Sequence, residues 1–151
     1  MRLFSMLAVT ALVALGSQAQ AAWQSIPGSD CSAALGSQTN QFNVIGDTGF
    51  VRIGANSAWV TCPIQRTMFV RNILYVNLNH PSARETNCKV IHSDYLTGVS
   101  RSMAIVARGT GNVFAGFDTR TLGTMQDYDT YSVSCNIAQG TTVRGVSWQD
   151  N

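Results

Sequence analysis

Apolar and polar residues alternate at every second position through most of this chain, and this pattern constrains the fold more than any other feature. In residues 74–79, leucine and valine alternate with tyrosine and asparagine. In residues 131–137, Tyr131, Val133 and Cys135 alternate with serine and asparagine. Successive side chains of a β-strand point to opposite faces of the sheet, so both segments predict strands with one buried and one solvated face.

Turn-forming residues divide the chain into short strands. Further strands are predicted at residues 41–45, 49–53, 58–62, 68–72, 87–93, 99–107, 112–117 and 143–148, with turns at 46–47, 56–57, 80–82, 94–98, 109–112 and 139–140. Gly109-Thr110-Gly111 lacks the lysine and the following helix of a phosphate loop, and it predicts a hairpin turn. Helix is predicted only as a single turn at 32–35. This pattern predicts an all-β fold, a two-sheet antiparallel sandwich of jelly-roll type.

The first 21 residues have the organisation of a signal peptide. Arg2 precedes an apolar run from Leu3 to Leu15, which is too short for a stable membrane anchor. Ala19-Gln20-Ala21 offers small residues at the positions that a signal peptidase reads. We therefore expect residues 1–21 to be cleaved and residues 22–151 to form one secreted or periplasmic domain. No later apolar stretch has the length of a membrane span.

The charge composition argues against a nucleic-acid partner. Ten basic residues face eight acidic ones, and Arg2 belongs to the signal, so the exported chain is close to neutral. A near-neutral chain has no broad field for nucleic acid, and no nucleic-acid partner is expected. Charged residues make up only 12% of the chain, so serine, threonine, asparagine, glutamine and glycine must build the surface.

The four cysteines, at Cys31, Cys62, Cys88 and Cys135, predict two disulfides. An even number in an exported chain is typical of disulfide bonding, whereas zinc sites place cysteines in close pairs that are absent here. Three connectivities are open to four cysteines. We favour Cys31–Cys62 and Cys88–Cys135, and we expect neither a metal nor a cofactor.

Candidate catalytic groups are sparse. His92 and Asp94 could share one face of a strand, although a strand-end histidine near a turn carboxylate is the simpler interpretation. The loop aspartates Asp118, Asp127 and Asp129 could pair as hydrolase carboxylates, and Asp127 and Asp129 could form half of a calcium site. Nothing in the sequence brings these aspartates together, and a solvated loop before the Tyr131 strand is the favoured interpretation. No nucleophile elbow or zinc-binding helix motif occurs, so no catalytic residue is assigned.

Aromatic residues in predicted loops are candidates for ligand binding. Tyr95 and Tyr128 fall in such loops, although ordinary loop packing is the favoured interpretation of both. Trp59 is expected to be the core tryptophan, while Trp23 and Trp148 flank the chain ends. The candidate binding residues are therefore Tyr95, Tyr128, Asp127, Asp129, His92 and Asp94.

Three short motifs carry a resemblance to known proteins. They are Cys62-Pro63 after a strand, Cys88-x-Val90-x-x-Ser93-Asp94 leading to Gly98, and Tyr131-Ser-Val-Ser-Cys135-Asn-Ile before Gly140. The chain resembles small exported disulfide-containing proteins of Gram-negative bacteria, usually called hypothetical. It differs from them in ending Trp148-Gln149-Asp150-Asn151 instead of in a strand closing on glutamate. The resemblance implies a disulfide-bearing β-sandwich and transfers no catalytic residue.

These observations favour an exported, non-enzymatic domain that binds a glycan or a protein at the cell surface, in the periplasm or outside. Two alternatives stay open. Weakly charged edge strands could pair with other chains, which would make the protein a structural subunit of an extracellular assembly. The loop aspartates, with His92, could instead serve a small hydrolase.

Overall fold

The computed structural model describes residues 22–46, 49–64, 70–122 and 129–150. The predicted signal peptide, residues 1–21, lies outside them. The described strands are β1 (Ala22–Pro27), β2 (Ser32–Ala33), β3 (Phe42–Ile45), β4 (Gly49–Arg52), β5 (Ala58–Ile64), β6 (Val70–Ser93), β7 (Ser100–Asp118), β8 (Thr130–Ile137) and β9 (Thr142–Asp150). Three short 3-10 helices accompany them: η1 (Gly28–Asp30), η2 (Gly36–Gln41) and η3 (Thr119–Leu122). No helix in the described ranges is long and apolar enough to cross a membrane.

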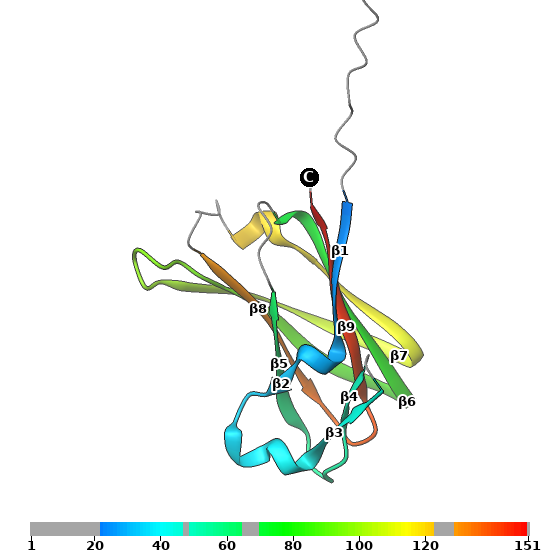
Figure 1. The fold of residues 1–151 in the computed structure, drawn as a ribbon. Helices are drawn as coiled ribbons and strands as arrows, with labels where there is room; N and C mark the ends of the chain where they lie inside the picture. Colours follow the sequence, from blue (N-terminus) through cyan, green and yellow to red (C-terminus); the bar gives the residue numbers. More distant parts are fainter. Residues whose placement is uncertain (1–21, 47–48, 65–69, 123–128, 151) are drawn as a thin grey trace, which may run out of the picture.

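A long antiparallel hairpin of β6 and β7 organises the fold. The two strands pair from Ile73–Asp118 to Ser93–Ser100, with a register shift between His80 and Arg84. On the other edge of β6, β9 pairs with residues 70–79 and β8 with residues 87–93. β6 and β7 bend at the register shift, and at the same level β8 ends and β9 begins. The sheet therefore folds back on itself, as the sharp corner of the β6–β7 ribbon in Figure 1 shows.

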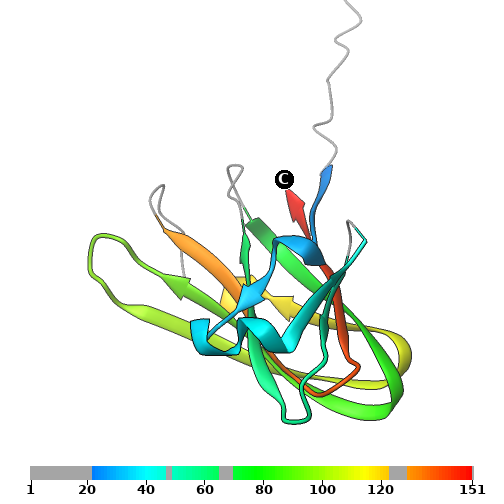
Figure 2. The same cartoon turned by 60° about the horizontal axis from the view of Figure 1, so that its bottom comes forward.

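The bend converts one continuous sheet into two layers. Layer 1 contains residues 70–80 of β6 and 111–118 of β7, together with β9, β1, β4 and β3; layer 2 contains residues 84–93 of β6 and 100–109 of β7, together with β8, β5 and β2 (Figure 2). The inner faces share one apolar cluster, with Leu74 and Val76 from layer 1 and Val90 and Val133 from layer 2 fully buried. The predicted all-β antiparallel sandwich, jelly-roll-like in architecture, is confirmed.

Glycine and histidine shape the corner between the layers. Gly109-Thr110-Gly111 lies inside β7, so the predicted hairpin turn there is wrong. Gly109 and Gly111 adopt φ of 137° and 72°, which L side chains rarely tolerate, and this freedom lets the strand bend without ending. His80, buried in the corner of β6, donates from Nδ1 to the carbonyl of Gly109 at 3.1 Å, and its Nε2 lies 2.9 Å from the Thr86 hydroxyl. The histidine thereby ties the two arms of the bend together.

Both disulfides form with the favoured connectivity. Cys88 and Cys135 lie directly opposite each other on β6 and β8, and their bond crosses the centre of layer 2. The Cys31–Cys62 bond ties the segment before β2 to β5. All four cysteines are buried, and both bonds belong to the core between the layers.

Two local predictions are wrong for reasons of strand parity and pairing. The helical turn expected at 32–35 is replaced by β2, which pairs with β5 through Ser32–Thr61 and Ala33–Val60. Trp59 is not the core tryptophan. Because β5 buries Ala58 and its even-numbered neighbours, Trp59 points outward, where the Lys89 ammonium lies 4.8 Å from its ring centroid. Trp148, only 3% exposed, is the core tryptophan.

Candidate functional site

The structure gathers several predicted residues at the end of layer 2 where β6 turns into β7. His92 points into the core and is 4% exposed. Its Nε2 lies 2.7 Å from Asp129 Oδ2, its Nδ1 lies 3.3 Å from the carbonyl of Leu122, and its ring stacks on Tyr131 with centroids 4.7 Å apart. Both ring nitrogens therefore contact oxygen atoms inside the protein, and His92 acts as a packing and hydrogen-bonding element.

Asp94 organises the turn between β6 and β7. Its Oδ1 accepts hydrogen bonds from the backbone N–H groups of Leu96 at 2.9 Å and Thr97 at 3.0 Å. These bonds, the Thr97 N–H first, lower the pKa of the Asp94 carboxyl below its ordinary value. The partner of His92 is Asp129 and not Asp94, because the turn already engages the Asp94 carboxylate.

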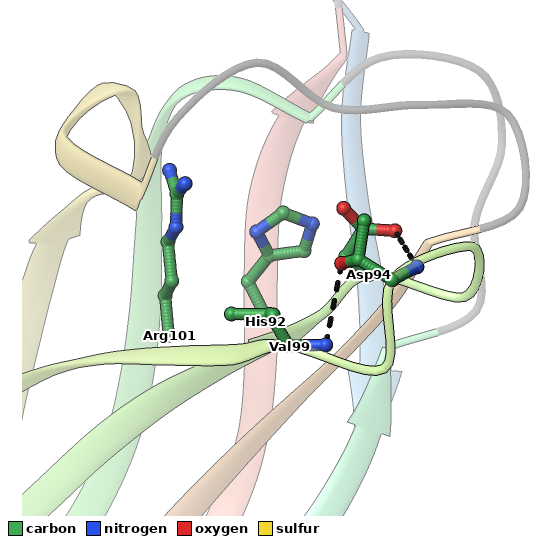
Figure 3. Close-up of a pocket in the computed structure, with 5 residues that line it drawn as sticks. His92, Asp94, Val99 and Arg101 are labelled. Carbon is green, nitrogen blue, oxygen red and sulfur yellow. Dashed lines mark hydrogen bonds between the residues drawn. The ribbon is translucent and has the colours of Figure 1, made fainter.

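A small pocket opens beside this turn. It has a volume of about 200 Å³ and is lined by His92, Asp94, Thr97, Val99 and Arg101. Figure 3 shows Arg101 and Asp94 on either side of the His92 ring. Tyr95, 74% exposed, lies in the same turn. The structure thus brings together four of the six predicted binding residues, His92, Asp94, Tyr95 and Asp129.

The remaining acidic candidates do not join this pocket in the described part of the chain. Asp127 and Tyr128 lie outside the described residues. The Asp118 carboxylate is paired with the Arg120 guanidinium, with Nε 2.9 Å from Oδ1, and this hydrogen bonding lowers its pKa. Among the described residues no group of three or more histidine, cysteine or acidic side chains could hold a metal ion.

A second surface, not predicted from the sequence, lies on the outer face of layer 1. Trp23 of β1 is 56% exposed, and its ring centroid lies 5.8 Å from that of Tyr75 on β6, with the planes tilted by 35°. Gly116 of β7 makes room for the Tyr75 ring, because a Cβ there would stand 3.0 Å from Tyr75 Cε1. We call Trp23 and Tyr75 the aromatic platform.

A groove of about 320 Å³ adjoins the platform across β9 and β1. Gly145 of β9 lines the groove and pairs with Asn77 of β6 on one side and Pro27 of β1 on the other. A Cβ on Gly145 would come within 2.6 Å of the Ile26 carbonyl, so the close strand approach requires glycine. The register shift between Asn77 and Leu78 makes Arg144 an extra residue at the rim.

The polar groups of this groove are amides, hydroxyls and one guanidinium. Ser25, Asn77, Arg144 and Ser147 line it. Asn77 Oδ1 is buried and has no hydrogen-bond partner among the described residues. A buried carbonyl oxygen without a partner costs free energy, so a ligand or water donor would satisfy it. The groove therefore places an unpaired hydrogen-bond acceptor beside the aromatic platform.

This surface cannot be recognised from the sequence alone, for a physical reason. Trp23 and Tyr75 lie far apart along the chain and become neighbours only because β9 pairs with β1 on one edge and β6 on the other. The available signal was parity: Tyr75, Asn77 and Asn79 occupy the solvated positions of a strongly alternating strand. That pattern identifies an outward aromatic and amide row but not its partner strand.

Comparisons with known proteins give no family for this chain. No protein-family model matches it, and no curated protein matches it. Among solved structures, the chain is similar to TmCBM61 in complex with beta-1,4-galactotriose, at 11% sequence identity and a TM-score of 0.39, over 85% of this chain and 83% of that chain. A likeness at this level carries no argument about what this chain binds.

Proposed function

We propose that this protein is an exported, non-catalytic module that binds a glycan on the outer face of layer 1. The aromatic platform is the observation that carries the proposal. A pyranose ring presents C–H groups on one face and hydroxyls around its rim, so it stacks on a flat exposed aromatic while its hydroxyls meet polar groups. Trp23 and Tyr75 supply two adjoining rings of this kind.

The groove beside the platform supplies the polar complement. Asn77, Ser25 and Ser147 line it with planar amide and hydroxyl groups. Sugar hydroxyls donate and accept hydrogen bonds at once, and the unsatisfied Asn77 Oδ1 would accept from one of them. The groups sit on paired strands, which hold them in place before a ligand arrives and so lower the entropic cost of binding.

The histidine at the other end of the sandwich favours binding over turnover. A general base must present a free nitrogen or oxygen to its substrate. In His92 both ring nitrogens already contact Asp129 and the Leu122 carbonyl. Two disulfides are compatible with an extracellular or periplasmic protein, and residues 1–21 would provide the export signal.

Isothermal titration calorimetry against a panel of soluble plant, algal and bacterial oligosaccharides tests the proposal. Trp23→Ala and Tyr75→Ala remove the two halves of the platform, and Trp59→Ala is the matched control. Trp59 also lies on an outer sheet face, but on layer 2. Stacking of a nucleobase on an aromatic side chain contributes about 1–3 kcal/mol. We expect a sugar face, which has no π-system, to gain the lower end of that range, so either platform variant should weaken binding by about tenfold.

Thermal unfolding of each variant separates lost binding from lost folding. The proposal requires that Trp59→Ala bind like the parent protein. Undiminished affinity in both platform variants would refute it, as would the absence of binding across the whole panel.

A second candidate function is assembly through β7. This strand extends from Ser100 to Asp118 and pairs only with β6 among the described strands, so its other edge is open to a further strand. Arg101 and Arg108 are the charged residues along it before Asp118, and charged side chains on an edge oppose pairing with another chain. Light scattering over a wide concentration range tests this role, and a monomer throughout would exclude it.

A further inference from the structure

The cation at the rim of the groove lacks an internal partner. Arg144 is exposed, lines the groove with Asn77 and Ser147, and makes no ion pair or hydrogen bond to any described residue. Two other arginines, one in β4 of layer 1 and one in η3 directly after β7, are engaged within the protein. Arg52 is bound by carbonyl and amide oxygens, and Arg120 pairs with Asp118.

No described acidic side chain lines the groove. Its polar lining consists of neutral groups plus Arg144. Asp30 on η1, which packs against β9, makes no ion pair with Arg144. A guanidinium beside neutral hydrogen-bonding groups attracts an anion and can hold a carboxylate or a sulfate through two parallel N–H···O bonds.

We infer that the groove recognises an acidic glycan, in which one sugar carries a carboxylate or a sulfate ester that Arg144 binds while a neighbouring sugar ring stacks on the aromatic platform. This inference rests on the proposed glycan-binding function and narrows its ligand class. The bulge of β9 explains why the cation stands here. Arg144, the extra residue of the bulge, is exposed and lines the groove next to Gly145.

The test compares matched ligands and matched variants. The probes are an oligogalacturonate, the same oligosaccharide after reduction of its carboxyl groups, and a sulfated galactan oligosaccharide. The variants are Arg144→Gln and, as control, Arg101→Gln. Arg101 is likewise exposed and has no ionic partner among the described residues, but it lies in the pocket of layer 2.

We expect an acidic probe to bind at least about tenfold more tightly than the carboxyl-reduced one, because a hydrogen bond between charged groups is stronger than one between neutral groups. Arg144→Gln should erase that preference, and Arg101→Gln should leave it intact. The affinity for the acidic probe should also fall as salt is raised. Comparing the affinities for the oligogalacturonate and the sulfated galactan shows whether the groove prefers a carboxylate or a sulfate ester, and a preference for either one supports the inference.

Equal affinities for the acidic and reduced probes, or an Arg144→Gln variant that keeps the preference, would overturn the inference. If those probes still bind with affinities that Trp23→Ala weakens, the glycan-binding function stands while the acidic specificity fails. If no probe binds at all, both fail together. Thermal unfolding confirms that Arg144→Gln folds, which is expected because the side chain is exposed.

Discussion

Arg52 and Gly54 should show a strong energetic coupling. Arg52 is 1% exposed. Its Nε donates to the Asn56 carbonyl at 2.8 Å, its Nη1 donates to the Gln41 carbonyl at 3.0 Å, and its Nη2 donates to the Gln41 side-chain oxygen. Its guanidinium also lies 4.8 Å from the Phe42 ring centroid. A buried cation is thus held by neutral acceptors and an aromatic face.

Gly54 is the point at which this arrangement can be probed. A Cβ on Gly54 would stand 2.7 Å from Cζ and from both Nη atoms of Arg52. The end of an arginine normally moves aside cheaply, but this one is held by three hydrogen bonds. Gly54→Ala should therefore cost about 1–3 kcal/mol of unfolding free energy, the range for forcing atoms into a packed site.

The destabilisation caused by Gly54→Ala should vanish when the guanidinium of Arg52 is removed. Arg52→Leu keeps apolar contact with Phe42 and vacates the positions of Cζ and both Nη atoms. In that background Gly54→Ala should be neutral, or stabilising by about 0.4–1 kcal/mol through the unfolded chain. The coupling energy between the two substitutions is then about 1–4 kcal/mol.

Urea unfolding followed by far-ultraviolet circular dichroism, with the disulfides intact, measures the four corners of this double-mutant cycle. Ser57→Ala on the same loop is the control, because the Ser57 side chain is exposed and makes none of the hydrogen bonds that hold Arg52. The reasoning is refuted if Gly54→Ala costs the same in both backgrounds, or nothing in the parent protein, because the guanidinium would then be free to move.

Three further outcomes are expected. Replacing Cys88 and Cys135 together by serine should lower the unfolding free energy by about 4 kcal/mol, from the loop entropy of a sequence separation of 47, and an unchanged urea midpoint would contradict this. Trp148→Ala should cost about 3–5 kcal/mol and Trp59→Ala far less in the same assay, because only Trp148 is fully packed in the core; equal losses would contradict that placement. Carbon-13 NMR should find the pKa of Asp94 below 3.8. The Asp94 carboxylate then stabilises the fold above pH 3.8, and this stabilisation is lost as the pH falls through the lowered pKa. A titration midpoint at or above 3.8 would show that the turn hydrogen bonds do not lower the pKa.

Strand parity was predictable and strand continuity was not. The alternation at residues 74–79 and 131–137 correctly identified which side chains enter the core. The breaks expected at 80–82 and 109–112 turned out to be a corner inside the continuous strands β6 and β7, whereas the break expected at 139–140 is a turn between β8 and β9, as predicted. Glycine and proline mark a change of direction in either case. Whether a strand ends there or bends depends on what its neighbours do at the same level.

In the candidate sites too, local interactions were predictable from the sequence and long-range contacts were not. The turn at Asp94 was predictable because its hydrogen bonds are local, and the carboxylate binds N–H groups two and three residues on. The partner of His92 was not, because Asp129 reaches it across a sequence distance of 37 residues. The aromatic platform was hidden for the same reason, since Trp23 and Tyr75 meet only across β9.

By itself the sequence determined the all-β class, the inward faces of the strands and the presence of two disulfides. Alternation and turn residues are properties of short segments, and an even number of cysteines is read directly from the chain, so none of these inferences depends on which strands pair. Only the tertiary structure decided that the sheet folds at one corner, that Trp148 and not Trp59 fills the core, and that a platform and a groove share the outer face of layer 1. Those features depend on which strands pair and in what register. Pairing is a competition between long-range contacts that no single segment encodes.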